Sequence, residues 1–220
     1  MFSRIIQKYW PEFYRGDNIP DICETVDEQL TKTKPVPGIE VFTRPFQLLD
    51  ADNVRCVFLG ETLIINKQRG NYITNGILFS SGKSFGKHQS TKNLHNELLR
   101  SHPDVNVGSD GDLSEWCRRG ILMIPIRFTF DPENQKRYQY WNMFTSALLQ
   151  YLYEKNNDIL VVLFGSASRE FLKSGSMSRC YFELIQVPHP STSNFIGCQL
   201  FQDIDDYYKG KGWELMDWNL

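Results

Sequence analysis

The sequence lacks several features that would assign it to a special class of protein. Its five cysteines are an odd number, and no CxxC motif occurs. The first residues, Met-Phe-Ser-Arg-Ile-Ile, lack the long apolar core of a signal peptide. No apolar run reaches the length of a membrane span. We therefore expect an intracellular protein with reduced core thiols in a reducing compartment, without a disulfide framework, a metal site or a cofactor.

A strong charge of one sign is also missing, because the formal net charge is only −2. A nucleic-acid-binding surface would therefore have to come from a local basic patch. What the sequence does contain is apolar and aromatic: hydrophobic residues make up 41% of the 220 positions and aromatic residues 14%. This composition predicts a packed globular protein rather than a disordered chain.

Short apolar runs alternate with amphipathic segments along the chain. Strands that alternate with helices predict a parallel sheet wound by right-handed crossovers. We expect a single α/β domain over residues 1–220, with a central four-stranded, mostly parallel sheet, helices on both faces, and a helical part at 1–50 packed on the core. The predicted strands are 54–60, 120–126, 159–165 and 181–187, and the predicted helices are 3–14, 21–32, 41–49, 90–100, 114–118, 140–154, 168–173 and 199–208.

Polar residues follow three of these strands. Glu61 comes directly after the first strand, Ser166 after the third, and His189 with Ser191 after the fourth. Ligands of open α/β sheets bind beyond the carboxyl ends of the strands, so these positions are candidates for chemistry. His189 is held between two prolines and is suited to donating a hydrogen bond to a developing anion. A structural histidine, and serines that only cap helices, explain the same residues equally well.

The order and spacing of several short motifs resemble the classical uracil-DNA glycosylase family across most of the chain. Residues 54–60 resemble the strand before the family's water-activating loop, GQDPYHG, and residues 76–80 resemble its GLAFS. The other matching stretches are 113–125 (LESWARQGVLLLN), Trp141 with Phe144 and Thr145 (WETFT), 163–166 (LWGS), 189–192 (HPSP), 197–198 (FGC) and 212–218 (GETPIDW). The resemblance implies the uracil-DNA glycosylase-like fold.

This sequence departs from the family at the residues that carry out its chemistry. Thr62 stands where the family has the aspartate that orients the attacking water, and Ile64 stands where its tyrosine excludes thymine. Pro125 replaces the asparagine that recognises uracil. The family's leucine wedge, which fills the gap left by the flipped base, has only Phe195 or Ile196 as a substitute.

Other family residues are present. The resemblance implies that Phe79 stacks on the base, and that His189 stabilises the leaving uracil anion. It also implies that Ser90, Ser166 and Ser191 grip DNA phosphates, with Lys87 beside Ser90. From this combination we expect a glycosylase-fold protein that has lost efficient base excision, is not an enzyme, and acts by binding DNA or a protein partner. Some viral members of the family act in this way, within replication complexes.

Two alternatives remain open at this point. A divergent active glycosylase would use Glu61 to orient water and His189 to stabilise the leaving base, because other branches of the superfamily carry a glutamate in a similar place. A pure protein-interaction module would use aromatic residues near the two ends of the chain as partner surfaces. The same aromatic residues are equally typical of a core.

Overall fold

Four parallel strands form the central sheet of the protein. The structure is a computed structural model that describes residues 1–68, 71–131, 136–137, 140–174, 177 and 180–220. The strand order is β4 (Ile121–Arg127), β1 (Cys56–Thr62), β7 (Leu160–Phe164) and β8 (Glu183–Val187), and each neighbouring pair is parallel. The two inner strands are apolar along their buried length, as is usual for strands covered on both faces. The predicted fold class is confirmed.

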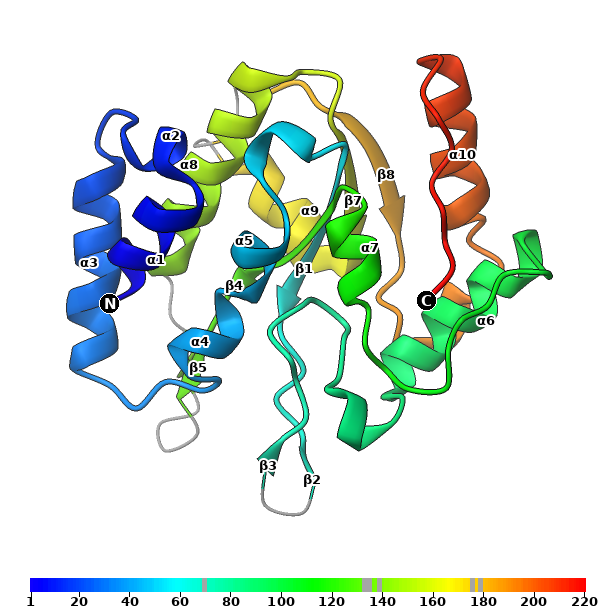
Figure 1. Cartoon of the computed structure of the whole chain (residues 1–220), viewed down its shortest axis with the longest axis horizontal. Coiled ribbons are helices and arrows are strands. Elements are labelled where there is room, and N and C mark those ends of the chain that lie inside the picture. The colour runs from blue at the N-terminus through cyan, green and yellow to red at the C-terminus, as the bar shows by residue number, and fades with distance from the viewer. Residues whose placement is uncertain (69–70, 132–135, 138–139, 175–176, 178–179) are drawn as a thin grey trace.

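Helices cover both faces of this sheet (Figure 1). The crossover from β1 to β4 contains α6 (Gln89–Ser101) and α7 (Ser114–Arg118). The later crossovers contain α8 (Tyr140–Lys155) and α9 (Gly165–Lys173), and they cross the sheet in the opposite direction. Right-handed crossovers therefore place α8 and α9 on the face opposite α7. The last helix, α10 (Leu200–Gly210), packs against α6 and β8.

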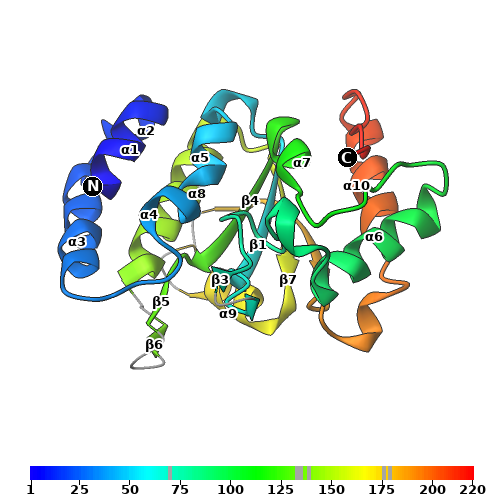
Figure 2. The ribbon, with the colours of Figure 1, turned by 60° about the horizontal axis from the view of Figure 1, so that its bottom comes forward.

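The N-terminal helices form a cluster on one side of the sheet (Figure 2). They are α1 (Phe2–Tyr9), α2 (Pro11–Tyr14), α3 (Ile19–Thr31), α4 (Ile39–Phe42) and α5 (Arg44–Leu48), with a 3-10 turn at Ala51–Asn53. Phe2 is fully buried, and its ring centroid lies 5.3 Å from Trp141 and 4.9 Å from Phe144 of α8. Edge-to-face pairs of this kind stabilise a core. Phe2 therefore belongs to the core of the protein.

The C-terminal tail is also packed into the protein. Trp218 is 2% exposed and its carbonyl accepts a hydrogen bond from Trp116 Nε1 at 2.9 Å. Tyr208 is equally buried. Together with Phe2, these residues show that aromatic side chains near both ends of the chain serve the core, which favours that alternative over a partner surface.

Several predicted boundaries differ from the structure. β1 continues to Thr62 instead of ending at Gly60, because Thr62 still pairs with Arg127 of β4. The helix predicted at 3–14 is divided into α1 and α2 at Trp10, directly before Pro11. A proline is favoured in the first turn of a helix and so starts a new one.

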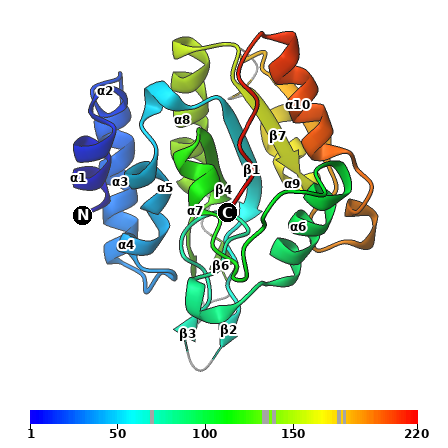
Figure 3. The ribbon, with the colours of Figure 1, turned by 45° about the vertical axis from the view of Figure 1, so that its right-hand side comes forward.

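Two further helix starts were misplaced. α3 begins at Ile19 with Asn18 as its N-cap, so Asp21, the predicted first residue, lies in the first turn. α9 begins at Gly165, so Ser166 lies in its first turn instead of in a loop. The sequence did not predict two short hairpins, β2 (Lys67–Gln68) with β3 (Asn71–Tyr72) and β5 (Phe130–Asp131) with β6 (Lys136–Arg137). The β2–β3 hairpin extends away from the sheet (Figure 3).

All five cysteines are free thiols, and Cys23, Cys56 and Cys117 are buried. Among the described residues, no helix has the length and apolar character needed to span a membrane.

Candidate active site

Phe79 occupies a strained position beside the end of β1. Its φ of +61° is uncommon for a residue with a bulky side chain, and strain of this kind clusters at functional sites. Thr91 Oγ1 on α6 donates a hydrogen bond to the Phe79 carbonyl at 2.5 Å. A Cβ on Gly60 would lie 3.3 Å from Phe79 Cζ and 2.9 Å from Leu78 Cδ1. Gly60 therefore lets this segment approach the strand closely.

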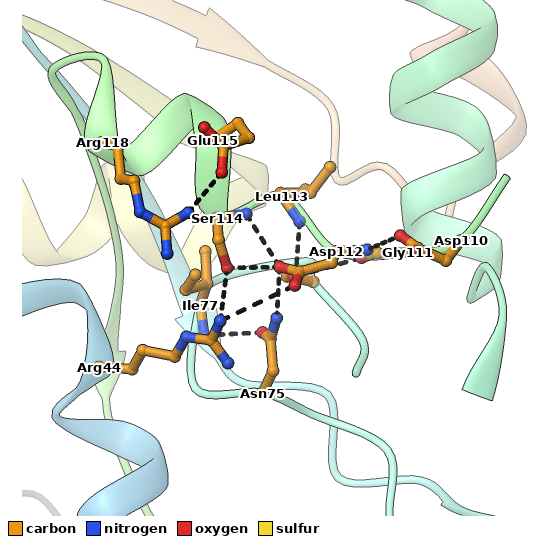
Figure 4. Close-up of polar contacts among 11 residues, drawn as sticks. Arg44, Asn75, Ile77, Asp110, Gly111, Asp112, Leu113, Ser114, Glu115 and Arg118 are labelled. Atoms are coloured by element: carbon orange, nitrogen blue, oxygen red, sulfur yellow. Dashed lines mark hydrogen bonds and ion pairs between the residues drawn. The ribbon is translucent and has the colours of Figure 1, made fainter. Parts of the chain in front are cut away.

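A polar network on the N-terminal side of Phe79 fixes the segment at Asn75 (Figure 4). Asp112 Oδ1 accepts hydrogen bonds from Asn75 Nδ2 at 2.9 Å, from the Ser114 backbone N–H at 3.0 Å and from the Ser114 hydroxyl. Asn75 Oδ1 in turn accepts the Ile77 N–H at 3.3 Å. Arg44 Nη2 donates to Ser114 Oγ at 2.9 Å and lies 3.8 Å from Asp112 Oδ2. The network joins α5, α7 and the segment that leads to Phe79.

His189 lies directly beside Phe79. The two ring centroids are 5.4 Å apart in an edge-to-face arrangement, and Phe164 packs 4.9 Å from Phe79 on another side. The Ser191 backbone N–H donates to His189 Nδ1 at 3.1 Å, and Ser191 Oγ lies 2.7 Å from the same nitrogen. Nδ1 is therefore the acceptor, and the neutral ring carries its proton on Nε2.

Burial lowers the pKa of His189 from its ordinary value. The Glu61 carboxylate opposes this effect, and the charge of His88 adds to it. The net result favours a neutral imidazole whose Nε2–H is a hydrogen-bond donor at neutral pH. A neutral donor of this kind can stabilise an anion that develops nearby.

Glu61 lies near the carboxyl end of β1, beside the end of β4. Its Oε1 accepts a hydrogen bond from Arg127 Nη1 at 3.1 Å, across the ends of β1 and β4. Glu61, Arg127 and side chains of α8 and α9, among them Asn142 and Phe171, line an open cleft of about 740 Å³. Its carboxylate therefore faces this cleft, while its charge also acts on His189.

The residues that replace the family's base-recognising groups are apolar and buried. Ile64 is 7% exposed, and its neighbour Leu63 is 3% exposed. Pro125 pairs with Gly60 in the register of β1 and β4. A proline is tolerated there because β4 is an edge strand. No polar side chain replaces the missing asparagine at position 125.

The predicted phosphate-binding residues lie in different environments. Ser166 and Ser191 are exposed, whereas Ser90 is only 3% exposed in the first turn of α6. Lys87 Nζ donates to the Gly108 carbonyl at 2.8 Å, and burial lowers the pKa of this lysine. Ser191 already engages His189 through Oγ.

The two wedge candidates also differ. Phe195 is fully buried, with its ring 6.4 Å from that of Phe164, whereas Ile196 is 39% exposed. Of the two candidates, Ile196 is therefore the exposed one in this conformation. Among the residues that the structure describes, no group of three His, Cys, Asp or Glu side chains could hold a metal ion.

Four residues of this region were not predicted from the sequence: Arg127, Asp112, and the α6 residues Asn93 and Glu97, which contact the loop after His189. Only Arg127 carried a signal, because it lies two residues beyond the position of the missing asparagine. For the other three, the contacts to Asn75 and to the loop after His189 join residues at least 37 positions apart in the chain.

Comparison with known proteins supports the resemblance noted in the sequence. No family model matches the chain. A uracil-DNA glycosylase of Francisella tularensis subsp. novicida is 25% identical over 190 residues, which cover 84% of each protein. One from Acinetobacter baumannii is 28% identical over 203 residues, 88% of this chain and 81% of the relative. The crystal structure of mimivirus uracil-DNA glycosylase has the same fold, with a TM-score of 0.77, 18% identity, and coverage of 99% of this chain and 87% of that one.

These relatives contradict the main functional expectation from the sequence. We expected a protein that had lost base excision and was not an enzyme, because Thr62 and Pro125 replace the family's aspartate and asparagine. The matching relatives are named as uracil-DNA glycosylases, so that expectation was wrong and the alternative, a divergent active enzyme, fits better. The chain is similar to uracil-DNA glycosylases, in sequence over most of its length and in the fold of its four-stranded sheet.

Proposed function

We propose that this protein is a uracil-DNA glycosylase, which hydrolyses the N-glycosidic bond between uracil and deoxyribose in DNA. The observation that carries the proposal is the combination of glycosylase relatives over most of the chain with the contact between Phe79 and His189. In this proposal Phe79 supplies the ring that stacks on the base, and His189 beside it supplies a neutral Nε2–H donor. Phe79 is 2% exposed in this structure, so a base reaches its ring only after the side chains around it move.

Glu61 and His189 divide the chemistry in this proposal. Glu61 orients a water molecule toward the sugar C1′ and accepts its proton as the carbon–nitrogen bond breaks. The bonding electrons leave with the base, and His189 Nε2–H stabilises the uracil anion that results. A positioned base contributes roughly 10²–10⁴ in rate. Glu61 has room for water because it lines the open cleft, whereas Phe79 and His189 are not among the residues that line this cleft.

Uracil-containing single-stranded and duplex oligonucleotides test the proposal directly. We expect alkali-labile strand cleavage after incubation with the wild-type protein, reduced roughly 10²–10⁴-fold by Glu61→Gln. Glu170→Gln is a matched control, because Glu170 lines the same cleft and is exposed. The proposal fails if the wild-type protein produces no cleavage above a protein-free control. If Glu61→Gln cleaves as fast as wild type, the assignment of Glu61 is wrong.

DNA is the partner that this activity requires. We propose that Ser166, Ser191 and Ser90 with Lys87 contact phosphates around the flipped nucleotide. The exposure of Ser166 and Ser191 supports this role. For Ser90 the support is its position in the first turn of α6. Phosphate contacts give an affinity that falls with salt. Fluorescence anisotropy of labelled DNA between 50 and about 200 mM salt measures that slope. A flat slope would contradict the phosphate contacts.

We also propose a place for the protein in DNA repair or in a replication complex, with a protein partner, as the family resemblance suggests for viral members. The free thiols support a reducing compartment such as the nucleus or a DNA-replication site. Cross-linking in infected or expressing cells, followed by identification of the cross-linked proteins, tests this. Polymerase-associated or repair proteins are the expected result, and their absence would contradict the proposal.

A further inference from the structure

The loop that follows His189 is held along its length by helix α6. After β8, residues 188–199 run past α6 before α10 begins (Figure 2). This loop carries His189 at its beginning and the exposed Ile196 near its end. Two side chains of α6, Asn93 and Glu97, contact it, and they are one helical turn apart on the same face.

Glu97 binds the end of the loop. Its side chain is 3% exposed, yet its carboxylate accepts the Gly197 N–H at 2.5 Å and the Gln199 N–H at 2.9 Å. Arg100 Nε lies 3.4 Å from the same carboxylate. A buried carboxylate is stable when hydrogen bonds and a counter-charge compensate it, as they do here.

The residues that Glu97 binds adopt unusual backbone conformations. Gly197 has a φ of +95° and Gln199 a φ of +60°. A residue other than glycine rarely adopts a positive φ, as Gln199 does here, unless other interactions offset the strain. The two charge-assisted hydrogen bonds that these backbone N–H groups donate to Glu97 provide that compensation. They determine where the residue before Gly197, Ile196, is presented.

Asn93 binds the beginning of the loop. Its Nδ2 donates to the Pro190 carbonyl at 2.6 Å, one residue after His189. His189 is also fixed by its own contact with the Ser191 N–H. The Asn93 contact therefore restrains the backbone on which the imidazole depends.

We propose that Asn93 and Glu97 are positioning residues with separate tasks. Asn93 holds the backbone of His189 at the base, and Glu97 holds Ile196 as the side chain that enters the duplex. This inference rests on the proposed glycosylase activity. Because the departing base is an anion in any DNA substrate, the Asn93 contact matters for single-stranded and duplex DNA alike. A wedge fills a gap in stacked base pairs, so the Glu97 contact matters for duplex DNA alone.

The test compares Asn93→Ala and Glu97→Gln on single-stranded and duplex uracil oligonucleotides. Misplacement of a catalytic group by about 1 Å can cost up to 10²-fold in rate. We expect Asn93→Ala to lower kcat roughly tenfold on both substrates. We expect Glu97→Gln to lower kcat/KM roughly tenfold on duplex DNA and to leave the single-stranded value within about twofold of wild type. Glu97→Asp, which keeps the carboxylate, should recover part of the duplex activity.

Asn96→Ala is the matched control, because Asn96 is exposed on the same helix and should behave as wild type. Thermal unfolding of every variant shows whether the protein remains folded at the assay temperature. The proposal is overturned if Glu97→Gln lowers activity on both substrates by the same factor. It is equally overturned if the losses only follow the unfolded fraction.

A binding measurement separates this inference from the proposed function. Fluorescence anisotropy with labelled uracil-containing DNA gives the ratio of duplex to single-strand affinity without requiring catalysis. Glu97→Gln should lower this ratio several-fold, and Asn93→Ala should not change it. If the wild-type protein does not cleave DNA but the ratio falls in Glu97→Gln, the proposed function fails and the role of Glu97 is supported. An unchanged ratio in Glu97→Gln contradicts that role.

Discussion

Arg127 and Glu61 form an ion pair across the ends of neighbouring strands, with Arg127 Nη1 3.1 Å from Glu61 Oε1. Thr62 pairs with Arg127 in the strand register, so the sheet itself brings the guanidinium to the carboxylate. The pair is partly exposed, at 23% for the Arg127 side chain and 32% for Glu61. Its contribution to stability is therefore modest, and its main effect is to set the direction of Glu61.

Replacing Arg127 with alanine should impair excision more than folding. The carboxylate of Glu61 loses the donor that orients it, so we expect kcat to fall roughly tenfold with a small change in KM. Arg127→Lys, which keeps the charge, should retain an intermediate kcat. Steady-state cleavage of a uracil oligonucleotide measures both. A rise in KM at unchanged kcat would mean that Arg127 binds substrate instead of positioning Glu61.

His189 should titrate below its ordinary range. Because burial lowers its pKa, the ring stays neutral as the pH falls through 6.5 and gains a proton only in more acidic solution. NMR titration of the histidine ring protons should give a midpoint below 6.5, and His189→Gln assigns the signal by its disappearance. A midpoint above 6.5 would contradict the neutral donor assigned to His189.

His95 should make the stability of the protein depend on pH. Its ring is 2% exposed, and its two nitrogens find no hydrogen-bond partner among the described residues. Burial is the largest cause of a pKa lowered from 6.5 to about 4; the charge of Lys87 also lowers it, and Asp110 opposes the shift. Between pH 6.5 and 4 the unfolded chain therefore binds a proton that the folded protein does not. The free energy of unfolding should be highest above pH 6.5 and should decrease by on the order of 3 kcal/mol as the pH approaches 4.

Urea unfolding of wild type and His95→Leu between pH 7 and 4.5 measures this contribution. His88 and His189 also have lowered pKa values, so the difference between the two proteins isolates His95. The variant should lose less stability in acid than the wild type does. Parallel pH profiles for the two proteins would show that His95 is not the cause.

Asp112 should be important for stability because one of its carboxylate oxygens accepts hydrogen bonds from three donors. Asp112→Ala leaves Asn75 Nδ2 and the Ser114 N–H without their acceptor. Loss of these partly buried hydrogen bonds should lower the free energy of unfolding by about 2–3 kcal/mol. Asp104→Ala, at an exposed carboxylate, should change it by no more than about 0.5 kcal/mol. Equal effects of the two substitutions in chemical denaturation would contradict this account.

Much of the fold could be predicted from the sequence, because apolar runs of strand length and amphipathic segments are local signals. The helix at Ser114–Arg118 has the predicted bounds, and β1, β4 and β7 lie where apolar runs occur, whereas β8 mixes polar and apolar residues. The ends of elements were less accurate. β1 extends to Thr62 because of a pairing with Arg127, and no property of residues 61 and 62 alone indicates that contact.

The candidate site was also predicted only in part. Strand ends and short motifs identified Glu61, Phe79 and His189, and the structure brings Phe79 and His189 into contact. Substitution at Thr62 and Pro125 suggested a loss of activity that the named relatives contradict. A residue-by-residue comparison weighs each missing group separately, whereas catalysis depends on how the remaining groups are arranged.

The sequence by itself determined the α/β class, the order of the strands along the chain, and the place of Glu61 near the carboxyl end of the first strand. The tertiary structure alone decided the cleft that Glu61 faces, the choice of Nε2 as the proton-bearing nitrogen of His189, and the exposure of Ile196 instead of Phe195. The physical reason is that each of these depends on partners from other elements or on how the loop after His189 packs. Periodicity within a segment carries no information about such contacts.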